Sequence, residues 1–289
     1  MTRRVLDIHP HIISPDTQRY PRAPLGGTAS TWSQERPKTT EMLLAAMDEA
    51  GVAGAAIVQA STCYGFDNRY VADAVAQHPD RFTGVFSVDM NAPDAPAAIR
   101  HWADRRLTGL RLFTAGSTLS FQPDWLANPR SFPAWDCAVE LGLPVCIQMR
   151  VAGLPQLEVL LRRYPKATLV IDHFMSVPLD SGPPYPDAEP LFSLARHENL
   201  HLKLTPIIIN GACKGAATPQ TFFPRVLRAF GAERIAWGSN FPTNAGTLSE
   251  LLQTSREALD FASSDELDAV FRKTAEKLYP ALTRCATRA

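Results

Sequence analysis

The sequence predicts a parallel (β/α)8 barrel, a TIM barrel, as one domain spanning residues 1–289. Three observations lead to this α/β fold class. Eight short apolar, β-branched runs recur along the chain, helical patterns lie between them, and 289 residues suit one large α/β barrel. Strict alternation of strand and helix implies parallel strands, and eight such units close a barrel rather than form an open sheet.

The eight apolar runs define the expected strands. They cover residues 5–12, 55–60, 82–89, 107–114, 143–149, 168–175, 200–206 and 234–241. We expect helices over 40–52, which begins with a threonine N-cap and stops at a glycine, and over 69–79 and 154–165, which both end at proline. The segment 247–279 supplies the closing helices, with serine caps and an acidic first turn in SSDELDAVF.

Two segments rich in proline and glycine are too irregular to be simple connections. They cover residues 14–39 and 176–190, and each follows an expected strand. A barrel places such segments on its carboxyl-terminal face, where loops that cover a substrate belong. A proline-rich loop is equally often a stiff connector, so both interpretations stay open.

Charge and composition exclude several classes of protein. Lysine plus arginine and aspartate plus glutamate both total 29, and no basic block is present that could follow a nucleic acid or an anionic membrane. No segment approaches ~20 uninterrupted apolar residues, and the N-terminus lacks the long apolar stretch of a secretion signal, so we expect a cytoplasmic protein. Five widely spaced cysteines without a C-x-x-C pair argue against a disulfide framework or a thiolate zinc site.

A cluster of histidines is expected at the carboxyl ends of the strands. Side chains alternate along a strand, so Asp7, His9 and His11 project to one side of the first strand, with His11 nearest the rim. Neutral imidazoles bind metal and carry protons near neutral pH, which is what a metal site or a hydrolytic water needs. Asp172 and His173 end the sixth strand, and we expect His173 to face inward and Asp172 to face the helices.

The other histidines are expected at the surface. They are His78, His101, His197 and His201, which fall in expected helices or before strands. Three cations, Arg111, Arg150 and Lys203, lie at or near the same rim as the histidine cluster. Because arginine forks match carboxylates, these cations indicate a small anionic substrate.

Several motifs together resemble the amidohydrolase superfamily, in its amidohydrolase-related branch with the pyrone-dicarboxylate lactonase, the sulfomuconolactone hydrolase and fuconolactonase-like enzymes. The resemblance runs nearly end to end and rests on DIHPHI, VQAS, LTGLRL, VIDHF, HLKLT and WGSNFP. It implies that Arg111 and Ser61 bind a substrate carboxylate. We expect Tyr64 to line the same wall, and Ser61 could equally cap the helix that follows it.

The chain departs from this family at one important position. Members of the superfamily commonly carry aspartate where WGSNFP has Asn240, and that aspartate is their general base or metal ligand. Asn240 cannot accept a proton, so a histidine or a metal-bound hydroxide takes the base role if the site is active. The chain also has Arg111 and Gln148 where binuclear members carry a carbamylated lysine and a histidine. We therefore expect one zinc-like ion on His9, His11 and His173, or no metal.

The sequence predicts a hydrolase that opens a small carboxylated lactone or related cyclic ester by water attack. Two alternatives stay open. The same barrel serves lyases that decarboxylate or hydrate unsaturated or aromatic acids, and Asn240 also allows a catalytically impaired binding barrel. The sequence leaves open whether the chain forms a homo-oligomer.

Overall fold

A computed structural model describes residues 4–116, 118–119 and 124–285. Its centre is one sheet of eight parallel strands in the order β1 to β8, each hydrogen-bonded to the next. The strands are β1 Val5–Asp7, β2 Val52–Val58, β3 Phe82–Phe86, β4 Leu107–Phe113, β5 Val145–Gln148, β6 Leu169–Asp172, β7 Leu200–Leu204 and β8 Ile235–Trp237. Ile8 N donates to Trp237 O at 3.2 Å and links the first strand to the last. The predicted (β/α)8 barrel is confirmed.

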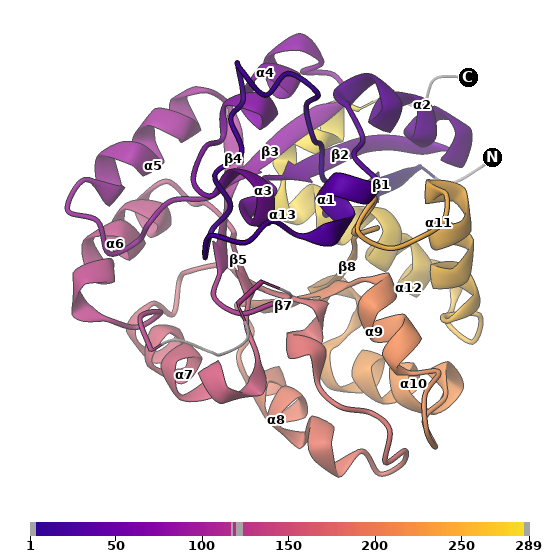
Figure 1. The fold of residues 1–289 in the computed structure, drawn as a ribbon. Coiled ribbons are helices and arrows are strands. Elements are labelled where there is room, and N and C mark those ends of the chain that lie inside the picture. The colour runs from indigo at the N-terminus through magenta and orange to yellow at the C-terminus, as the bar shows by residue number, and fades with distance from the viewer. Residues whose placement is uncertain (1–3, 117, 120–123, 286–289) are drawn as a thin grey trace.

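Helices surround the strands on the outside and also lie over the ends of the barrel, as Figure 1 shows. They are α1 Thr31–Glu35, α2 Thr40–Ala50, α3 Ser61–Tyr64, α4 Arg69–Gln77, α5 Ala95–Asp104, α6 Phe132–Glu140, α7 Leu154–Arg163, α8 Glu189–Phe192, α9 Pro206–Gly211, α10 Pro219–Phe230, α11 Leu248–Glu257, α12 Ser264–Asp268 and α13 Thr274–Leu278. No helix in the described part of the chain is long and apolar enough to cross a membrane.

The expected types of helix cap are present, although the threonine that caps α2 is Thr39 and not the expected Thr40. Thr39 accepts a hydrogen bond from Met42 N and caps α2, and Gly51 ends that helix with a left-handed φ of 70°. Ser263 caps α12 in a capping box with Glu266. These local interactions stabilise helix ends that the barrel then packs against its strands.

The C-terminal segment closes the amino-terminal opening of the barrel. Apolar side chains that point inward from the strands form a cluster with residues of α13 and of the following 3-10 helix, Pro280–Arg284. Tyr279 is fully buried in this cluster, and its hydroxyl lies 3.2 Å from Cys146 Sγ on β5. The opposite end of the barrel therefore remains for the site.

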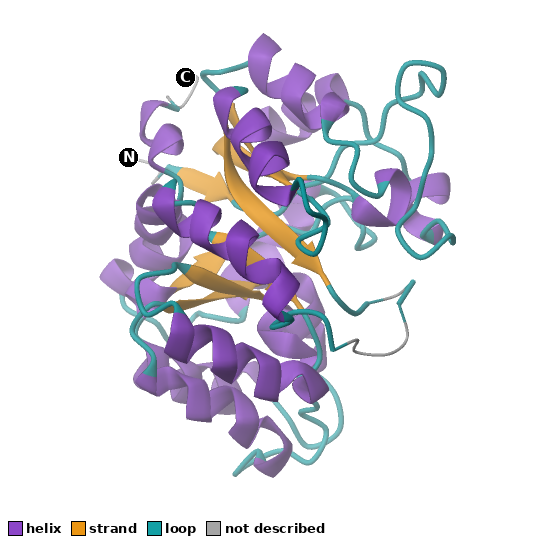
Figure 2. Ribbon diagram, turned by 90° about the vertical axis from the view of Figure 1, so that its left-hand side faces the viewer, coloured by secondary structure: helices purple, strands orange, loops and turns teal. Residues whose placement is uncertain are grey.

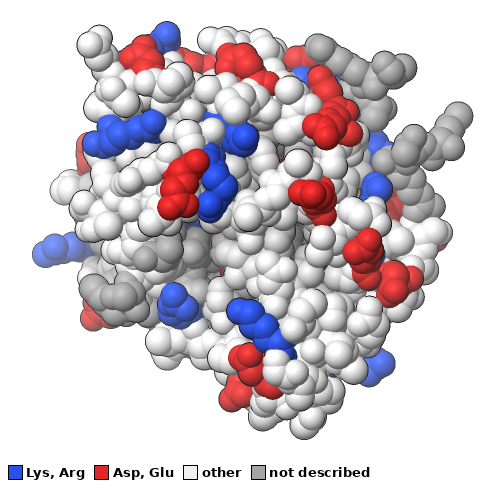
Figure 3. Space-filling view, turned by 45° about the vertical axis from the view of Figure 1, so that its right-hand side comes forward, with Lys and Arg blue, Asp and Glu red and all other residues white. Residues whose placement is uncertain are grey.

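The long loops and the two chain ends lie at opposite ends of the barrel. In Figure 2 the strand arrowheads point toward the side where the long loops gather, and both chain ends lie on the other side. Figure 3 shows one face of the molecule, on which basic and acidic side chains are interspersed rather than gathered by sign.

The structure corrects the expected position of one histidine. His201 lies on β7 and is only 3% exposed, whereas we expected a surface residue. Burial, followed by the charge of Lys277, lowers the pKa of His201 to about 4. His201 lies inside the segment 200–206 that we expected to be a strand, and every residue of β7 is buried, so its place in that strand should have indicated a buried side chain.

Candidate active site

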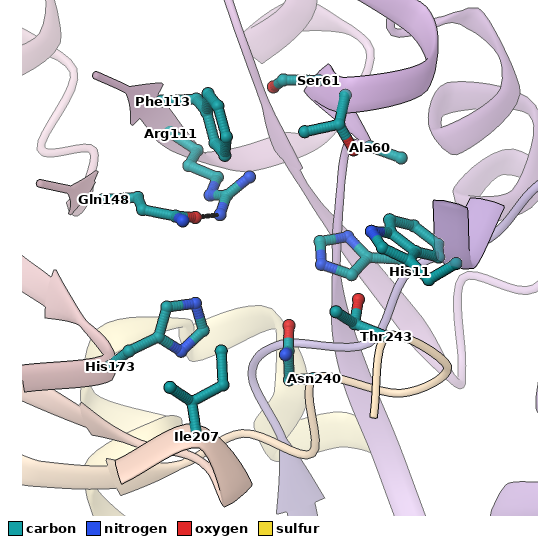
Figure 4. Close-up of a pocket in the computed structure, with 12 residues that line it drawn as sticks. His11, Ala60, Ser61, Arg111, Phe113, Gln148, His173, Ile207, Asn240 and Thr243 are labelled. Atoms are coloured by element: carbon teal, nitrogen blue, oxygen red, sulfur yellow. Dashed lines mark hydrogen bonds between the residues drawn. The ribbon is translucent and has the colours of Figure 1, made fainter. Parts of the chain in front are cut away.

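A pocket of about 130 Å³ opens at the carboxyl-terminal end of the barrel. Figure 4 shows Arg111, Phe113 and Ser61 on one side of this pocket and His173, Ile207 and Asn240 on the other. The described residues that line it are His11, Trp32, Ala60, Ser61, Thr62, Arg111, Phe113, Gln148, His173, Ile207, Asn240 and Thr243. We call it the central pocket.

His9 and His11 follow the end of β1 and are held by different contacts. Asp7 Oδ1 accepts from His9 N and from Ser239 N, both at 2.9 Å, which ties the end of β1 to the end of β8. His11 Nδ1 lies 2.7 Å from Val58 O. His9 is fully buried and does not line the central pocket, but its ring centroid lies 5.0 Å from that of His11 and 5.0 Å from that of His173.

Both residues at the end of β6 face the interior, which corrects our expectation that Asp172 points to the helices. Asp172 is 1% exposed and ion-paired inside the barrel, and His173 lines the central pocket. The alternation rule fails because the strand ends at Asp172. His173 begins a turn with a positive φ of 53°, and the three residues after it are also left-handed. His173 Nδ1 lies 2.7 Å from Thr205 Oγ1.

Asp172 connects two cations and one histidine. Its Oδ1 lies 2.8 Å from Lys203 Nζ and 3.8 Å from His9 Nδ1, and its Oδ2 accepts from Arg111 Nε at 2.9 Å. Burial opposes the charge of Asp172, but Lys203 and Arg111 together hold the pKa of its carboxyl well below the usual range. Lys203 is fully buried and does not line the central pocket, so our placement of Lys203 among substrate-binding residues is not supported by its position.

The three site histidines are neutral at physiological pH. Burial is the largest cause for each of them: it lowers the pKa of His11 and His173 to about 3 and the pKa of His9 well below its usual value. The charges of Arg111 and Lys203 lower all three further. Neutral imidazoles can ligate a metal or accept a hydrogen bond from water.

Arg111 is fixed on the side of the pocket opposite His173. Its Nη2 donates to Gln148 Oε1, its Nε donates to Asp172, and its guanidinium lies 5.2 Å from the centroid of the Phe113 ring. No described residue accepts a hydrogen bond from Nη1 in this arrangement. Ser61 also lines the pocket, and its Oγ donates to Gln59 Oε1 at 2.8 Å.

Two further expected substrate-binding residues lie elsewhere. Tyr64 is buried behind Ser61, where its hydroxyl accepts from Ser14 N at 2.8 Å and from Arg22 Nη1 at 2.6 Å. Arg150 is exposed and lines a separate open cavity with Ser176 and Asp187. Neither residue lines the central pocket, because Tyr64 is held by the 14–39 segment and the chain leaves β5 before Arg150.

Asn240 lines the central pocket in a left-handed conformation with a φ of 52°. Asparagine tolerates this conformation better than most residues. Its Nδ2 donates to Asn244 Oδ1 at 2.9 Å, and its carbonyl oxygen faces the pocket in Figure 4.

Three groups in the site have the arrangement of metal ligands. One ligand atom from each of His9, Asp172 and His173 lies within 4.8 Å of the others. This set contains Asp172 in place of the expected His11. Both ring nitrogens of His9 are buried and make no hydrogen bond in the described structure. Because buried polar atoms are normally bonded, this imidazole is a candidate metal ligand.

Residues that line the central pocket but were not predicted from the sequence include Trp32, Ile207 and Thr243. Trp32 on α1 stacks on His11 with ring centroids 5.3 Å apart, and it comes from the irregular segment 14–39. Thr243 and Ile207 follow β8 and β7. The one sequence signal for Ile207 and Thr243 is their position just after an expected strand. The segment 176–190 contributes no described residue to this pocket and instead packs on α10, where Tyr185 Oη lies 2.5 Å from Thr221 Oγ1.

A parallel eight-stranded barrel with histidines, a buried carboxylate and an arginine at its carboxyl-terminal end defines the class of amidohydrolase-type barrel hydrolases. The chain belongs to the amidohydrolase family, whose model matches residues 6–281. It is an enzyme of the hydrolase class.

The chain is similar to two curated proteins and to a solved structure. It is 30% identical over 210 residues to L-fucono-1,5-lactonase of Burkholderia ambifaria, covering 72% of this chain and 70% of the relative. It is 27% identical over 253 residues to a 2-pyrone-4,6-dicarboxylate hydrolase of Comamonas testosteroni, covering 82% of this chain and 76% of the relative. A structure described as a 2-pyrone-4,6-dicarboxylic acid hydrolase from Pseudomonas putida superposes with a TM-score of 0.78 at 22% identity, covering 97% and 99% of the two chains.

Proposed function

We propose that this enzyme opens the ring of a small carboxylated lactone or related cyclic ester by attack of water. One observation carries the proposal: Arg111 and the histidines His11 and His173 face each other across one pocket of about 130 Å³. The arginine can donate hydrogen bonds to a carboxylate. The imidazoles can polarise the lactone carbonyl and accept a proton from the attacking water. The curated relatives named as a lactonase and a pyrone-dicarboxylate hydrolase support this reaction class.

Arg111 binds the substrate carboxylate in this proposal. Asp172 and Gln148 hold the guanidinium through Nε and Nη2, which leaves Nη1 directed to a ligand. Because the arginine is fixed by protein contacts before the substrate arrives, little side-chain freedom is lost on binding. Ser61 lines the same pocket and can turn its hydroxyl proton from Gln59 Oε1 to the carboxylate.

The histidines act on the reacting carbonyl and on water. The contact of His11 Nδ1 with Val58 O places the imidazole proton on Nδ1 and leaves Nε2 as the acceptor. His173 is held through Nδ1 by Thr205, so its Nε2 takes part in proton transfer at the carbonyl or water. A bound carboxylate compensates the Arg111 charge, one cause of the low pKa values of both histidines, so their basicity rises when substrate is present.

Asn240 positions water rather than taking its proton. Its amide oxygen faces the pocket and can accept a hydrogen bond, but an amide has no useful basicity. The base role therefore falls to an imidazole in this proposal, with Asn240 and His11 orienting the attacking water.

The donor set also fits one zinc-like divalent ion. His9 has two buried ring nitrogens without hydrogen bonds, while Lys203 and Arg111 already compensate Asp172. His9 and His173 would hold the ion, with either Asp172 from the same cluster or the neighbouring His11 as the third donor, and the ion would act as a Lewis acid and water activator. Without an ion the same imidazoles bind the water directly.

The decisive experiment assays pyrone- and muconolactone-type acids and follows both ring opening and carbon dioxide. We expect one carboxylate to appear for each lactone consumed, without carbon dioxide. Release of carbon dioxide with the ring intact would contradict the proposal and favour a decarboxylase. If the chain turns over nothing and only Asn240→Asp creates turnover, the barrel is an impaired binding protein.

A further inference from the structure

A second cavity of about 400 Å³ adjoins the central pocket. The two cavities share Ser61, Arg111 and Phe113 in their walls, so a ligand on Arg111 can extend into both. The second cavity is about three times larger than the central pocket, whose 130 Å³ suit a compact reacting ring. We call the second cavity the side pocket.

The wall of the side pocket is mainly apolar. Its large apolar residues come from the loops after β1, β2 and β4 and from the ends of β3 and β4. They are Leu25, Phe66, Val88, Leu112, Leu119 and Trp125, together with Phe113 on the shared wall. Phe66 is 42% exposed, so this part of the wall is open to solvent and accessible to a ligand.

The charges around the side pocket favour a ligand with only one carboxylate. Arg111 is the one cation among its described lining residues, and that cation lies on the wall shared with the central pocket. The one acidic residue in the described lining is Asp89, which is exposed and accepts from Asn91 N at 3.0 Å. A second carboxylate placed here would meet Asp89 without a cation of its own.

We propose that the side pocket binds an apolar aryl or alkyl substituent of a monocarboxylate lactone whose carboxylate lies on Arg111. This inference rests on the proposed function for the reaction, but not for the binding itself. It assigns this chain a substrate class unlike the dicarboxylate in the name of the Comamonas relative. The substrate class differs because the described wall of the side pocket is mainly apolar and partly aromatic and contains one cation, Arg111, which binds only one carboxylate.

The kinetic test compares carboxylated lactones that differ only in one substituent: methyl, phenyl or a second carboxyl group. We expect kcat/KM for the phenyl compound to exceed that for the methyl compound by roughly 10-fold or more, and the dicarboxylate to be the poorest substrate. Equal kcat/KM values for phenyl and methyl compounds, with both rings opened, would overturn the side pocket and leave the proposed function intact.

Substitutions in the wall of the side pocket test whether the preference for the phenyl compound arises there. Leu25→Trp fills the side pocket and is expected to abolish the phenyl preference while the methyl compound is still turned over. Phe66→Ala, at an exposed position, is expected to reduce the same preference without affecting folding. Leu141→Trp is the matched control, because Leu141 is 37% exposed and ends α6 away from both pockets. A phenyl preference that survives both site variants would contradict the proposal.

Asp89→Asn tests the charge argument, since asparagine keeps an acceptor for Asn91 N. We expect kcat/KM for the dicarboxylate to rise several-fold and that for the phenyl compound to stay constant. An unchanged dicarboxylate value would contradict the assignment of Asp89 as the excluding group.

Calorimetry with 3-phenylpropionate and glutarate gives a readout that needs no turnover. We expect 3-phenylpropionate to bind more tightly than glutarate, and Leu25→Trp to weaken only 3-phenylpropionate. This pattern without hydrolysis of any lactone would sustain the side pocket and refute the proposed reaction. Equal binding of the two acids, or a 3-phenylpropionate Kd unaffected by Leu25→Trp, would refute the side pocket.

Discussion

Lys203 Nζ lies 2.8 Å from Asp172 Oδ1, and both side chains are fully buried beside the active site. The two residues are register partners on the neighbouring strands β6 and β7, so the barrel itself sets their contact. Asp172 in turn fixes the Arg111 side chain, because its other oxygen accepts a hydrogen bond from Arg111 Nε. The pair therefore holds the proposed carboxylate-binding arginine from below.

Lys203→Met is expected to lower the free energy of unfolding by roughly 3 kcal/mol, measured by urea denaturation, because breaking a buried ion pair leaves a charge without its partner. Arg111 still compensates Asp172 in this variant, which keeps the loss from being larger. The double variant Lys203→Met with Asp172→Asn removes both charges and is expected to recover part of the loss. A single variant as stable as the parent would show that the pair contributes nothing.

Arg111→Lys is expected to reduce kcat/KM for a carboxylated lactone by roughly 100-fold, because lysine keeps the charge but loses the planar fork. Turnover of the matching neutral lactone, which lacks the carboxylate, should change little. The measurement compares steady-state kinetics of the two substrates in both proteins. Equal losses on both substrates would place Arg111 at the reacting carbonyl instead.

Metal content is open to direct measurement on protein purified without added metal. We expect elemental analysis to give one zinc-like ion per chain, and His9→Ala and His173→Ala to lose it. His78→Ala, at a histidine on the distant end of α4, is the matched control and should keep the ion. Full activity with no bound ion would establish the metal-independent reaction.

His201 makes stability depend on pH. Its pKa falls from 6.5 to about 4 on folding, so the neutral form stabilises the fold above pH 6.5, and this contribution is lost as the pH falls through 4. The stability difference between the parent and His201→Gln should be constant above pH 7 and shrink by about 3 kcal/mol at pH 4.

Denaturation at both pH values measures this difference. His101→Gln changes an exposed histidine and serves as the control, for which a constant difference is expected. A constant difference for His201→Gln as well would show that His201 is not buried in the neutral form.

All eight strands could be predicted because each is a short apolar run, and apolar runs reflect burial on both faces of a parallel sheet. His9 and His11 could be placed at the end of the barrel because they stand in the expected strand 5–12, although the observed strand β1 already ends at Asp7. The orientation of Asp172 could not be predicted. It depends on the residue at which β6 ends and on the left-handed turn that starts at His173, and neither has a local sequence signal.

Long-range contacts account for the other differences. Lys203 resembles a rim cation in sequence, but its partner Asp172 lies 31 positions away on the neighbouring strand and keeps it buried. Tyr64 is held by Ser14 and Arg22 from a loop without regular pattern. Trp32 reaches His11 from the same loop. Such contacts exist only after the barrel has assembled.

The closure of the barrel by Tyr279 and its neighbours has a consequence for protein synthesis. Strand β1 is made first, yet the side chains that cover its inward face, among them Leu278 and Leu282, are made about 270 residues later. A nascent chain with all eight strands but without this segment leaves apolar side chains at one mouth of the barrel in contact with water. Such a chain exposes the kind of apolar surface that chaperones bind until the segment 274–285 emerges from the ribosome and folds.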